Sequence, residues 1–424
     1  MGVVSCGTTM LDQGVFENIG AVTWDTTVKT SGFTAVSGNG YFCNTTSAAF
    51  TVTLPSSPSA GDIVGIKDYA NTADTNNITI GRNSSPIQGD AADFIINTEG
   101  RSVLLVYIDG TKGWLVTSAS QASDIAEQAF FVTATGGTVL TCGNFKTHVF
   151  TGPGTFTVCS AGNAAGSNTV DYFVIAGGGG TNNDRDAGAG AGGFRLSNSV
   201  GCVPAPTMSP LSNPAGLPVS ATGYPIVIGA GAAAVGPGIS NNGSPSSGLG
   251  ITSTAGGGSK QSGGSGGGGR CGPNAGAAGN TPPVSPPQGN NGGLGLSYTQ
   301  GTGGGGGAGA VGANGSPGQG GAGGAGSFLA DTFIGPTAPS YGTPGPVGST
   351  RYFAGGGGGA KYPGGPAGAG GAGGGGAGGP GSSVGTSGTT NTGGGAGGSG
   401  ANGGTAPNGA AGGSGIVMIR YKFQ

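Results

Sequence analysis

The sequence Val170-Asp171-Tyr172-Phe173-Val174-Ile175-Ala176 runs directly into four glycines, and Gly412-Gly413-Ser414-Gly415 leads into Ile416-Val417-Met418-Ile419-Arg420-Tyr421 near the end of the chain. Both apolar runs have the length and composition of buried strands. The 239 residues between them (177–415) contain 84 of the 105 glycines, because 21 glycines precede residue 177. We therefore expect the two runs to be neighbours in one sheet, with a single long glycine-rich insert between them.

The glycine-rich insert permits two interpretations, a disordered coil or an ordered scaffold. Ordering its 239 residues costs roughly 240–480 kcal/mol of backbone entropy, yet disordered chains are usually rich in charge. The insert holds nine charged residues and carries large anchors such as Phe194, Tyr224 and Phe333. We favour an ordered scaffold of packed polyglycine helices of the polyproline II type, which have no internal hydrogen bonds and can bond to one another. Collagen is excluded, because runs such as 303–307 and 355–359 break its three-residue period.

The rest of the chain predicts an all-β protein. Residues 41–120 form a small all-β module, with alternation at Phe50, Val52 and Leu54 and a hairpin loop at 109–113. Residues 1–40 are expected to be an N-terminal attachment segment and 121–132 a linker. Residues 133–424 then form a glycine-rich domain, in which 133–176 and 416–424 make a β-sandwich base and 177–415 the insert. Within the insert, 224–228 is the one clear strand.

Composition argues against several classes of function. Residues 1–130 carry five basic and twelve acidic residues, whereas the insert carries six basic and three acidic. A net charge of +3 over the insert is too dilute for nucleic-acid binding. The single histidine, His148, lies in an apolar strand, and we expect a satisfied or surface side chain and no enzymatic activity. No metal or cofactor is expected, since none of the six cysteines forms a CxxC pair.

The cysteines and apolar runs give two further expectations. We expect mainly free thiols, although Cys142 and Cys159 flank a hairpin-like stretch and a disulfide between them stays open. No targeting segment is recognised. The longest apolar run, near 103–108, is far too short to span a membrane, so the protein is not expected to be membrane-embedded.

Several segments resemble known proteins. VDYFVIAGGGG (170–180), GAGAGGFR (188–195), YPIVIGAG (224–231) and GGSGIVMIRY (412–421) resemble, in this order, the glycine-rich domain of bacteriophage tail fibres and related virion adhesins. TVTLPSSPSAGDIVGIKDYA (51–70) and SVLLVYIDGTKGWLV (102–116) resemble a small β module of phage tail-fibre and virion proteins, often homotrimeric.

The resemblance implies a structural virion fibre protein that is assembled as a homotrimer in the host cytoplasm. Its N-terminal region would contact other virion proteins of the tail or capsid. Its glycine-rich domain would recognise a host cell-surface glycan or an outer-membrane protein. The aromatic residues proposed as receptor contacts are Tyr341, Tyr352, Phe353 and Tyr362.

The sequence leaves alternatives open for the role of the aromatic residues and for the function of the protein. The same aromatic residues would serve equally well to hold the scaffold together. A capsid-associated head fibre or decoration protein with a purely structural role is the alternative function, and buried aromatics with Gly, Ser and Asn outside would be its sign. A depolymerase would need a pair of acidic residues in a groove, and the insert offers only Asp184, Asp186 and Asp331.

Overall fold

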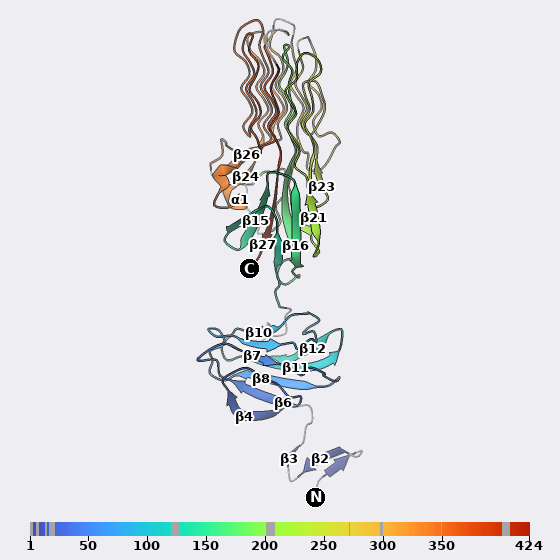
Figure 1. Ribbon diagram of the computed structural model, residues 1–424, viewed down its shortest axis with the longest axis vertical. Helices are drawn as coiled ribbons and strands as arrows, with labels where there is room; N and C mark the ends of the chain where they lie inside the picture. Colours follow the sequence, from blue (N-terminus) through green and yellow to red (C-terminus); the bar gives the residue numbers. More distant parts are fainter. Residues whose placement is uncertain are drawn as a thin grey trace. The chain divides into compact units, whose positions relative to one another are not determined.

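The computed structural model describes residues 22–119, 128–200, 208–270, 272–296, 300–348, 350–400 and 408–424, and the backbone alone of strands β1 (Val3–Ser5), β2 (Thr8–Asp12) and β3 (Val15–Phe16). The chain divides into two compact units, Met1–Gln128 and Ala129–Gln424 (Figure 1). The described part is mostly β-structure with almost no helix, which confirms the all-β class. Within it, no helix is long and apolar enough to cross a membrane.

Residues 22–119 of the N-terminal unit form two sheets around one core. The five-stranded sheet has the order β12-β11-β8-β6-β4 and the four-stranded sheet β10-β9-β7-β5. Their bounds are β4 (Thr23–Lys29), β5 (Phe33–Thr34), β6 (Asn39–Cys43), β7 (Phe50–Thr53), β8 (Ile63–Asp68), β9 (Ile78–Gly81), β10 (Phe94–Ile96), β11 (Ser102–Asp109) and β12 (Gly113–Ala119). From β4 to β9 the chain alternates between the sheets, so that β4, β6 and β8 run parallel, as do β5, β7 and β9.

The all-β module therefore begins earlier than residue 41. Strands β4 and β5 pair with β6 and β7, so they belong to the module and not to a separate N-terminal segment. Hydrophobic alternation gave no sign of this, because β4 is an edge strand whose side chains are mostly exposed and which joins the sheet through its backbone. The expected hairpin between β11 and β12 is confirmed. Most of the expected linker, residues 120–127, lies outside the described residues.

The base of the C-terminal unit is a seven-stranded sheet of order β14-β15-β27-β17-β18-β19, with β20 also paired to β17. Strand β17 (Thr169–Ile175) lies beside β27 (Ile416–Lys422), as the sequence predicted; the two pair antiparallel, with Ile175 opposite Ile416. Both faces of β17 are covered: Phe173 and Ile175 enter one core, whereas Tyr172 and Val174 enter the other. Burial on both sides explains why this strand reads as a continuous apolar run.

The remaining elements of this unit form the layers on either side of the sheet. A three-stranded sheet, β13-β16-β21, contributes to one core, and a small element around β24, α1 and β26 contributes to the other. Their bounds are β13 (Val132–Thr135), β14 (Thr138–Cys142), β15 (Phe145–Phe150), β16 (Gly154–Ala161), β18 (Phe194–Ser197), β19 (Ser212–Asn213), β20 (Leu217–Pro218), β21 (Gly223–Ile226), β22 (Ser246–Gly248), β23 (Ile251–Ser253), β24 (Ser327–Ala330), α1 (Asp331–Ile334), η2 (Ala338–Ser340), β25 (Thr343–Pro344) and β26 (Thr350–Phe353). The insert thus holds more strands than the one predicted at 224–228, because short strands such as β18 are defined by pairing with the base.

Glycine-rich segments of the insert run side by side away from the base (Figure 1); we call them the glycine bundle. In the segment 186–193, backbone N–H groups three residues apart donate to the same neighbouring segment at 2.7–3.0 Å. The pairs are Asp186, Ala189 and Gly192 to Ser399, Ala396 and Gly393; Gly188 and Ala191 to Gly303 and Gly306; and Gly190 and Gly193 to Gly257 and Thr254. A β-strand would repeat every two residues. A period of three indicates threefold helices of the polyproline II type.

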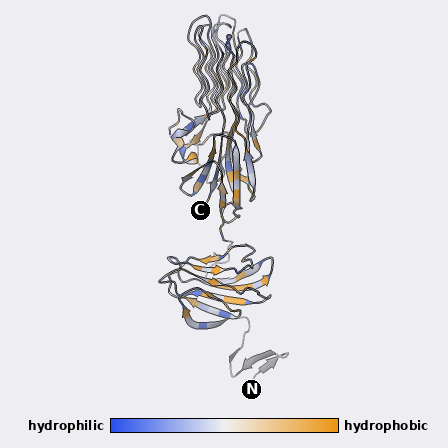
Figure 2. Ribbon diagram, viewed as in Figure 1, coloured by the Kyte–Doolittle hydropathy of each residue, from blue (hydrophilic) through white to orange (hydrophobic). Residues whose placement is uncertain are grey.

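Close approach of the helices explains the need for glycine. A Cβ atom added to Gly357 would lie 1.8 Å from the carbonyl oxygen of Ala396, and one added to Gly188 would lie 2.0 Å from that of Gly357. At the rim of the bundle, side chains take over the bonding, as where Asn242 Oδ1 accepts the N–H of Gly258 at 2.8 Å. The bundle carries little strongly hydrophilic or hydrophobic colour in Figure 2. Its cohesion therefore comes from backbone hydrogen bonds between helices.

Candidate functional site: the distal turns of the glycine bundle

The end of the bundle away from β17 and β27 gathers most of the charge of the insert. We call the connections there the distal turns and define them as residues 181–186, 236–240, 259–262, 316–319, 361–366 and 380–383. Residue contacts join them: Lys361 bridges to Gly301 and Pro380, and Gly301 N donates to Ser316 O at 2.9 Å. Six of the nine charged residues of the insert lie in these turns or beside them, namely Asp184, Arg185, Asp186, Lys260, Arg270 and Lys361. They give this end a net charge of +2, four basic minus two acidic residues.

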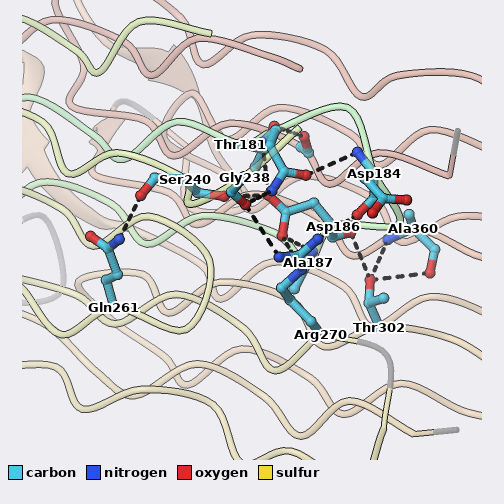
Figure 3. Close-up of polar contacts among 12 residues, drawn as sticks. Thr181, Asp184, Asp186, Ala187, Gly238, Ser240, Gln261, Arg270, Thr302 and Ala360 are labelled. Atoms are coloured by element: carbon cyan, nitrogen blue, oxygen red, sulfur yellow. Dashed lines mark hydrogen bonds and ion pairs between the residues drawn. The ribbon is translucent and has the colours of Figure 1, made fainter. Parts of the chain in front are cut away.

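A buried carboxylate, Asp186, holds several of these turns together (Figure 3). It is fully buried, and its Oδ1 lies 3.2 Å from Nε of Arg270. Oδ2 accepts the backbone N–H of Asn182 at 2.8 Å and the hydroxyl of Ser240, and Oδ1 accepts the N–H of Ala187 at 3.0 Å. From the sequence, Asp186 stood out only as one of the three acidic residues of the insert. Its partners Ser240 and Arg270 lie 54 and 84 residues further on, and nothing local predicts that they meet it.

The burial and the hydrogen bonds of the Asp186 carboxyl suit a residue that stabilises the fold. Burial raises the pKa of this carboxyl above the usual 3.8, and the Arg270 guanidinium and the hydrogen bonds offset only part of that effect. Arg270 also donates to two backbone carbonyls of the distal turns, that of Asp184 at 2.6 Å and that of Gly238 at 3.4 Å. Thr302 Oγ1 donates to the Asp186 carbonyl at 3.1 Å. This network fixes the distal turns relative to the helices beneath them.

Above this buried network, the distal turns offer side chains to the solvent. Tyr362 is partly exposed, and the Arg185 guanidinium stacks 4.4 Å from its ring centroid. Ile239 is 78% exposed, the highest value among the large apolar residues that the structure describes. Lys260, in another of the distal turns, is also exposed. An aromatic ring stacked by a cation, an exposed aliphatic residue and an exposed ammonium group are suited to contacts with another molecule.

The other three predicted contact residues lie elsewhere. Phe353 has no exposed surface and packs against Phe173 with ring centroids 4.8 Å apart. Tyr352 is 5% exposed and stacks on Phe328 at 5.2 Å. Tyr341 is partly exposed and packs against the same core as Phe353. These residues belong to the β24–β26 element at the base, so Phe353 and Tyr352 stabilise the fold, and only Tyr362 lies in the distal turns.

Other residues singled out in the sequence have structural surroundings. His148 is buried; its Nδ1 lies 2.7 Å from the carbonyl of Gly136 and its Nε2 3.0 Å from the Tyr421 hydroxyl. A carbonyl oxygen only accepts, so Nδ1 carries the proton and Nε2 accepts from Tyr421. Cys142 and Cys159 are free, so no disulfide joins them.

A protein family described as a glycine-rich domain matches residues 150–422, which is more than half of the chain. The matched region begins in the last residue of β15 and ends in β27, so it covers the whole glycine bundle and the base from β16 onward, but not β13, β14 or most of β15. No curated protein matches the sequence.

Proposed function

We propose, from the segments that resemble phage tail fibres, that this chain is a structural fibre protein of a bacteriophage virion; it belongs to the family defined by this glycine-rich domain. In this proposal a phage tail fibre attaches to the host surface through the glycine-rich unit, and the N-terminal unit joins copies of the chain and other virion proteins. No catalytic step is part of the proposal. The observation that carries it is the separation of roles within the glycine-rich unit, where a nearly uncharged bundle supports turns that hold most of the charge.

Recognition by loops on a rigid scaffold is a common arrangement for binding proteins, since the scaffold limits the entropy lost by the loops on binding. In this chain the bundle supplies the rigidity through backbone hydrogen bonds, and the Asp186 network fixes the turns. Tyr362, Ile239 and Lys260 then supply exposed aromatic, aliphatic and cationic groups. This set suits a cell-surface glycan or the loops of an outer-membrane protein.

The alternative is a capsid-associated head fibre or decoration protein without a receptor. The burial of Tyr352 and Phe353 favours it, because aromatic residues that hold the scaffold together were its expected sign. The distal turns count against it, since a purely structural tip needs neither an exposed isoleucine nor a stacked tyrosine.

Binding of the labelled full-length chain to a panel of bacterial strains tests the proposal. We expect saturable binding to a subset of strains and a loss of at least about tenfold in affinity for Tyr362→Ala and for Ile239→Asp, corresponding to about 1.4 kcal/mol each. Tyr341→Ala at the base is the matched control and should bind like the natural sequence. Equal losses in the distal and basal variants, or no saturable binding to any strain, would favour the decoration protein.

A further inference from the structure

The outer face of the five-stranded sheet of the N-terminal unit is unusually apolar. Residues in β11 alternate, with Val103 and Leu105 in the core and Leu104 and Val106 on the opposite face. The face also holds Ser102, Lys67 and Ser118, but most of its side chains are apolar and are partly or largely exposed: Trp24, Phe42, Ile63, Leu104, Val106, Ile108 and Leu115. Sheets with one solvated face normally place polar side chains there. Among the described strand residues that project to this face, Lys67 is the one that carries a charge.

Pairing across the strands makes these residues one continuous patch. Val106 lies opposite both Ile63 of β8 and Leu115 of β12, and Leu104 lies opposite Gly65 of β8. Phe42 stacks on Trp24 with ring centroids 4.9 Å apart. The patch therefore crosses the whole sheet from β4 to β12, and we call it the outer apolar face.

Two glycines position the exposed tryptophan. A Cβ atom at Gly40 would lie 2.7 Å from Cδ2 of Trp24, and one at Gly65 would lie 3.4 Å from its Cη2. The indole thus lies over the bare backbone of β6 and β8, yet Trp24 remains 40% exposed. A large aromatic side chain held flat and left open to solvent is typical of the centre of an interface.

We propose that the outer apolar face packs against the same region of other copies of this chain. This face would then be the contact surface of the homotrimer. The inference rests on the proposed function only for the existence of that homotrimer. Across the sheet the face spans four inter-strand spacings of about 4.8 Å, and along β11 its residues Leu104 to Ile108 span four residue steps of about 3.3 Å, so its backbone footprint is roughly 19 by 13 Å. This footprint is smaller than the roughly 800 Å² that each partner contributes to a standard interface, so the face supplies the apolar centre of the contact and its polar surroundings supply the rim.

Charge favours a second copy over an oppositely charged partner. Residues 22–119 carry five basic and eight acidic residues, a net charge of −3, so copies of this unit repel one another except where the surface is uncharged. The outer apolar face is such a surface, and three copies of it can meet around a threefold axis, where the face of each copy contacts those of the other two. A basic partner would instead select the acidic parts of the unit.

The two tryptophans allow a direct test on the full-length chain. Trp114 is fully buried, whereas Trp24 is 40% exposed, so acrylamide quenching reports on Trp24. Sedimentation and quenching are measured together over a range of protein concentrations. We expect assembly and protection of Trp24 to appear at the same concentrations. Leu104→Asp and the milder Trp24→Thr should each weaken assembly by at least about 100-fold.

Ile95→Asp is the matched control, because Ile95 is 38% exposed on β10 of the other sheet, and it should assemble normally. Three outcomes overturn the inference. Assembly with Trp24 still quenched means that the homotrimer forms through another surface. If the chain stays monomeric and Trp24 is quenched at every concentration, the proposed homotrimer is wrong as well. That result does not bear on the proposed attachment to bacteria. Protection that is independent of concentration and is lost on deleting residues 1–21 shows that the chain covers its own sheet.

Discussion

Replacing Gly357 by alanine tests whether backbone contact between threefold helices holds the C-terminal unit together. A Cβ atom there would lie 1.8 Å from the Ala396 carbonyl oxygen, whereas real Cβ contacts are essentially never under 3.0 Å. The two helices must therefore separate by at least about 1.2 Å, the difference of these distances. Between these two helices, Gly395 N donates to Gly355 O at 2.9 Å and Gly398 N donates to Gly358 O at 2.8 Å, and a separation of that size breaks bonds of this length.

The magnitude follows from the groups left without partners. Two buried backbone bonds cost about 1–3 kcal/mol each when one partner is withdrawn. Alanine lowers the entropy of the unfolded chain, which offsets about 0.4–1 kcal/mol. We expect a net loss of about 1.5–5 kcal/mol in the free energy of unfolding, or roughly 3–10 °C at about 2 °C per kcal/mol for a unit of this size.

Calorimetry combined with tryptophan fluorescence is the assay. Both tryptophans lie in the N-terminal unit, so fluorescence assigns that unit's transition and the remaining transition belongs to the glycine-rich unit. Gly357→Ala should lower only the second. The control is Gly318→Ala in a distal turn, where no atom lies within 4 Å of the added Cβ and φ is not in the left-handed region; it should be neutral or slightly stabilising. If the glycine-rich unit of Gly357→Ala unfolds at the same temperature as that of the natural sequence, the helices of Gly357 and Ala396 are not in close contact.

Three further predictions concern buried groups. Burial lowers the pKa of His148 below its usual 6.5, so the unfolded chain takes up the proton first. The unfolding free energy of its unit should therefore be constant above about pH 6.5 and fall as the pH drops below it, and calorimetry should show this part of the dependence lost in His148→Asn. Asp186→Ala leaves three hydrogen-bond donors and the Arg270 guanidinium without their acceptor and should cost about 2–4 kcal/mol in urea unfolding, whereas Asp184→Ala, with a partly exposed side chain, should cost less than about 1 kcal/mol. Burial raises the pKa of Cys43 to about 12, so a maleimide should label the exposed Cys159 in the folded protein and Cys43 only after unfolding, as peptide mass spectrometry would show.

The sequence contained enough information to predict the framework of the glycine-rich unit. The pairing of β17 with β27 was visible because both strands are buried on two faces and flank the insert. The ordered bundle was predicted from low charge and large anchors. The neighbours of each helix were not predictable, because a glycine run has no side-chain pattern that distinguishes the partner of 186–193 at 254–257 from that at 393–399.

The sequence also carries signals for two features of the surface, the outer face of β11 and the turn at 184–186. The apolar run 103–108 predicted a strand, yet its lack of alternation already implied that both faces of β11 are apolar, including the outer one. The charges at 184–186 follow the first glycine run and so mark a turn at its end. Aromatic residues were the weaker guide, since Phe328, Tyr352 and Phe353 gather where the insert returns to the base and needs a core.

The geometry of the bundle also restricts where recognition can change. A glycine whose Cβ would fall about 2 Å from a carbonyl, as at Gly188 and Gly357, tolerates no side chain without the loss of neighbouring bonds. The distal turns are under no such restriction, since Gly318 has free space around it and Ile239 is mostly exposed. Turns that meet at one end can therefore change in sequence and length while the helices beneath stay the same. A bundle built from glycine thus leaves the surface chemistry of its tip free to follow the partner that it binds.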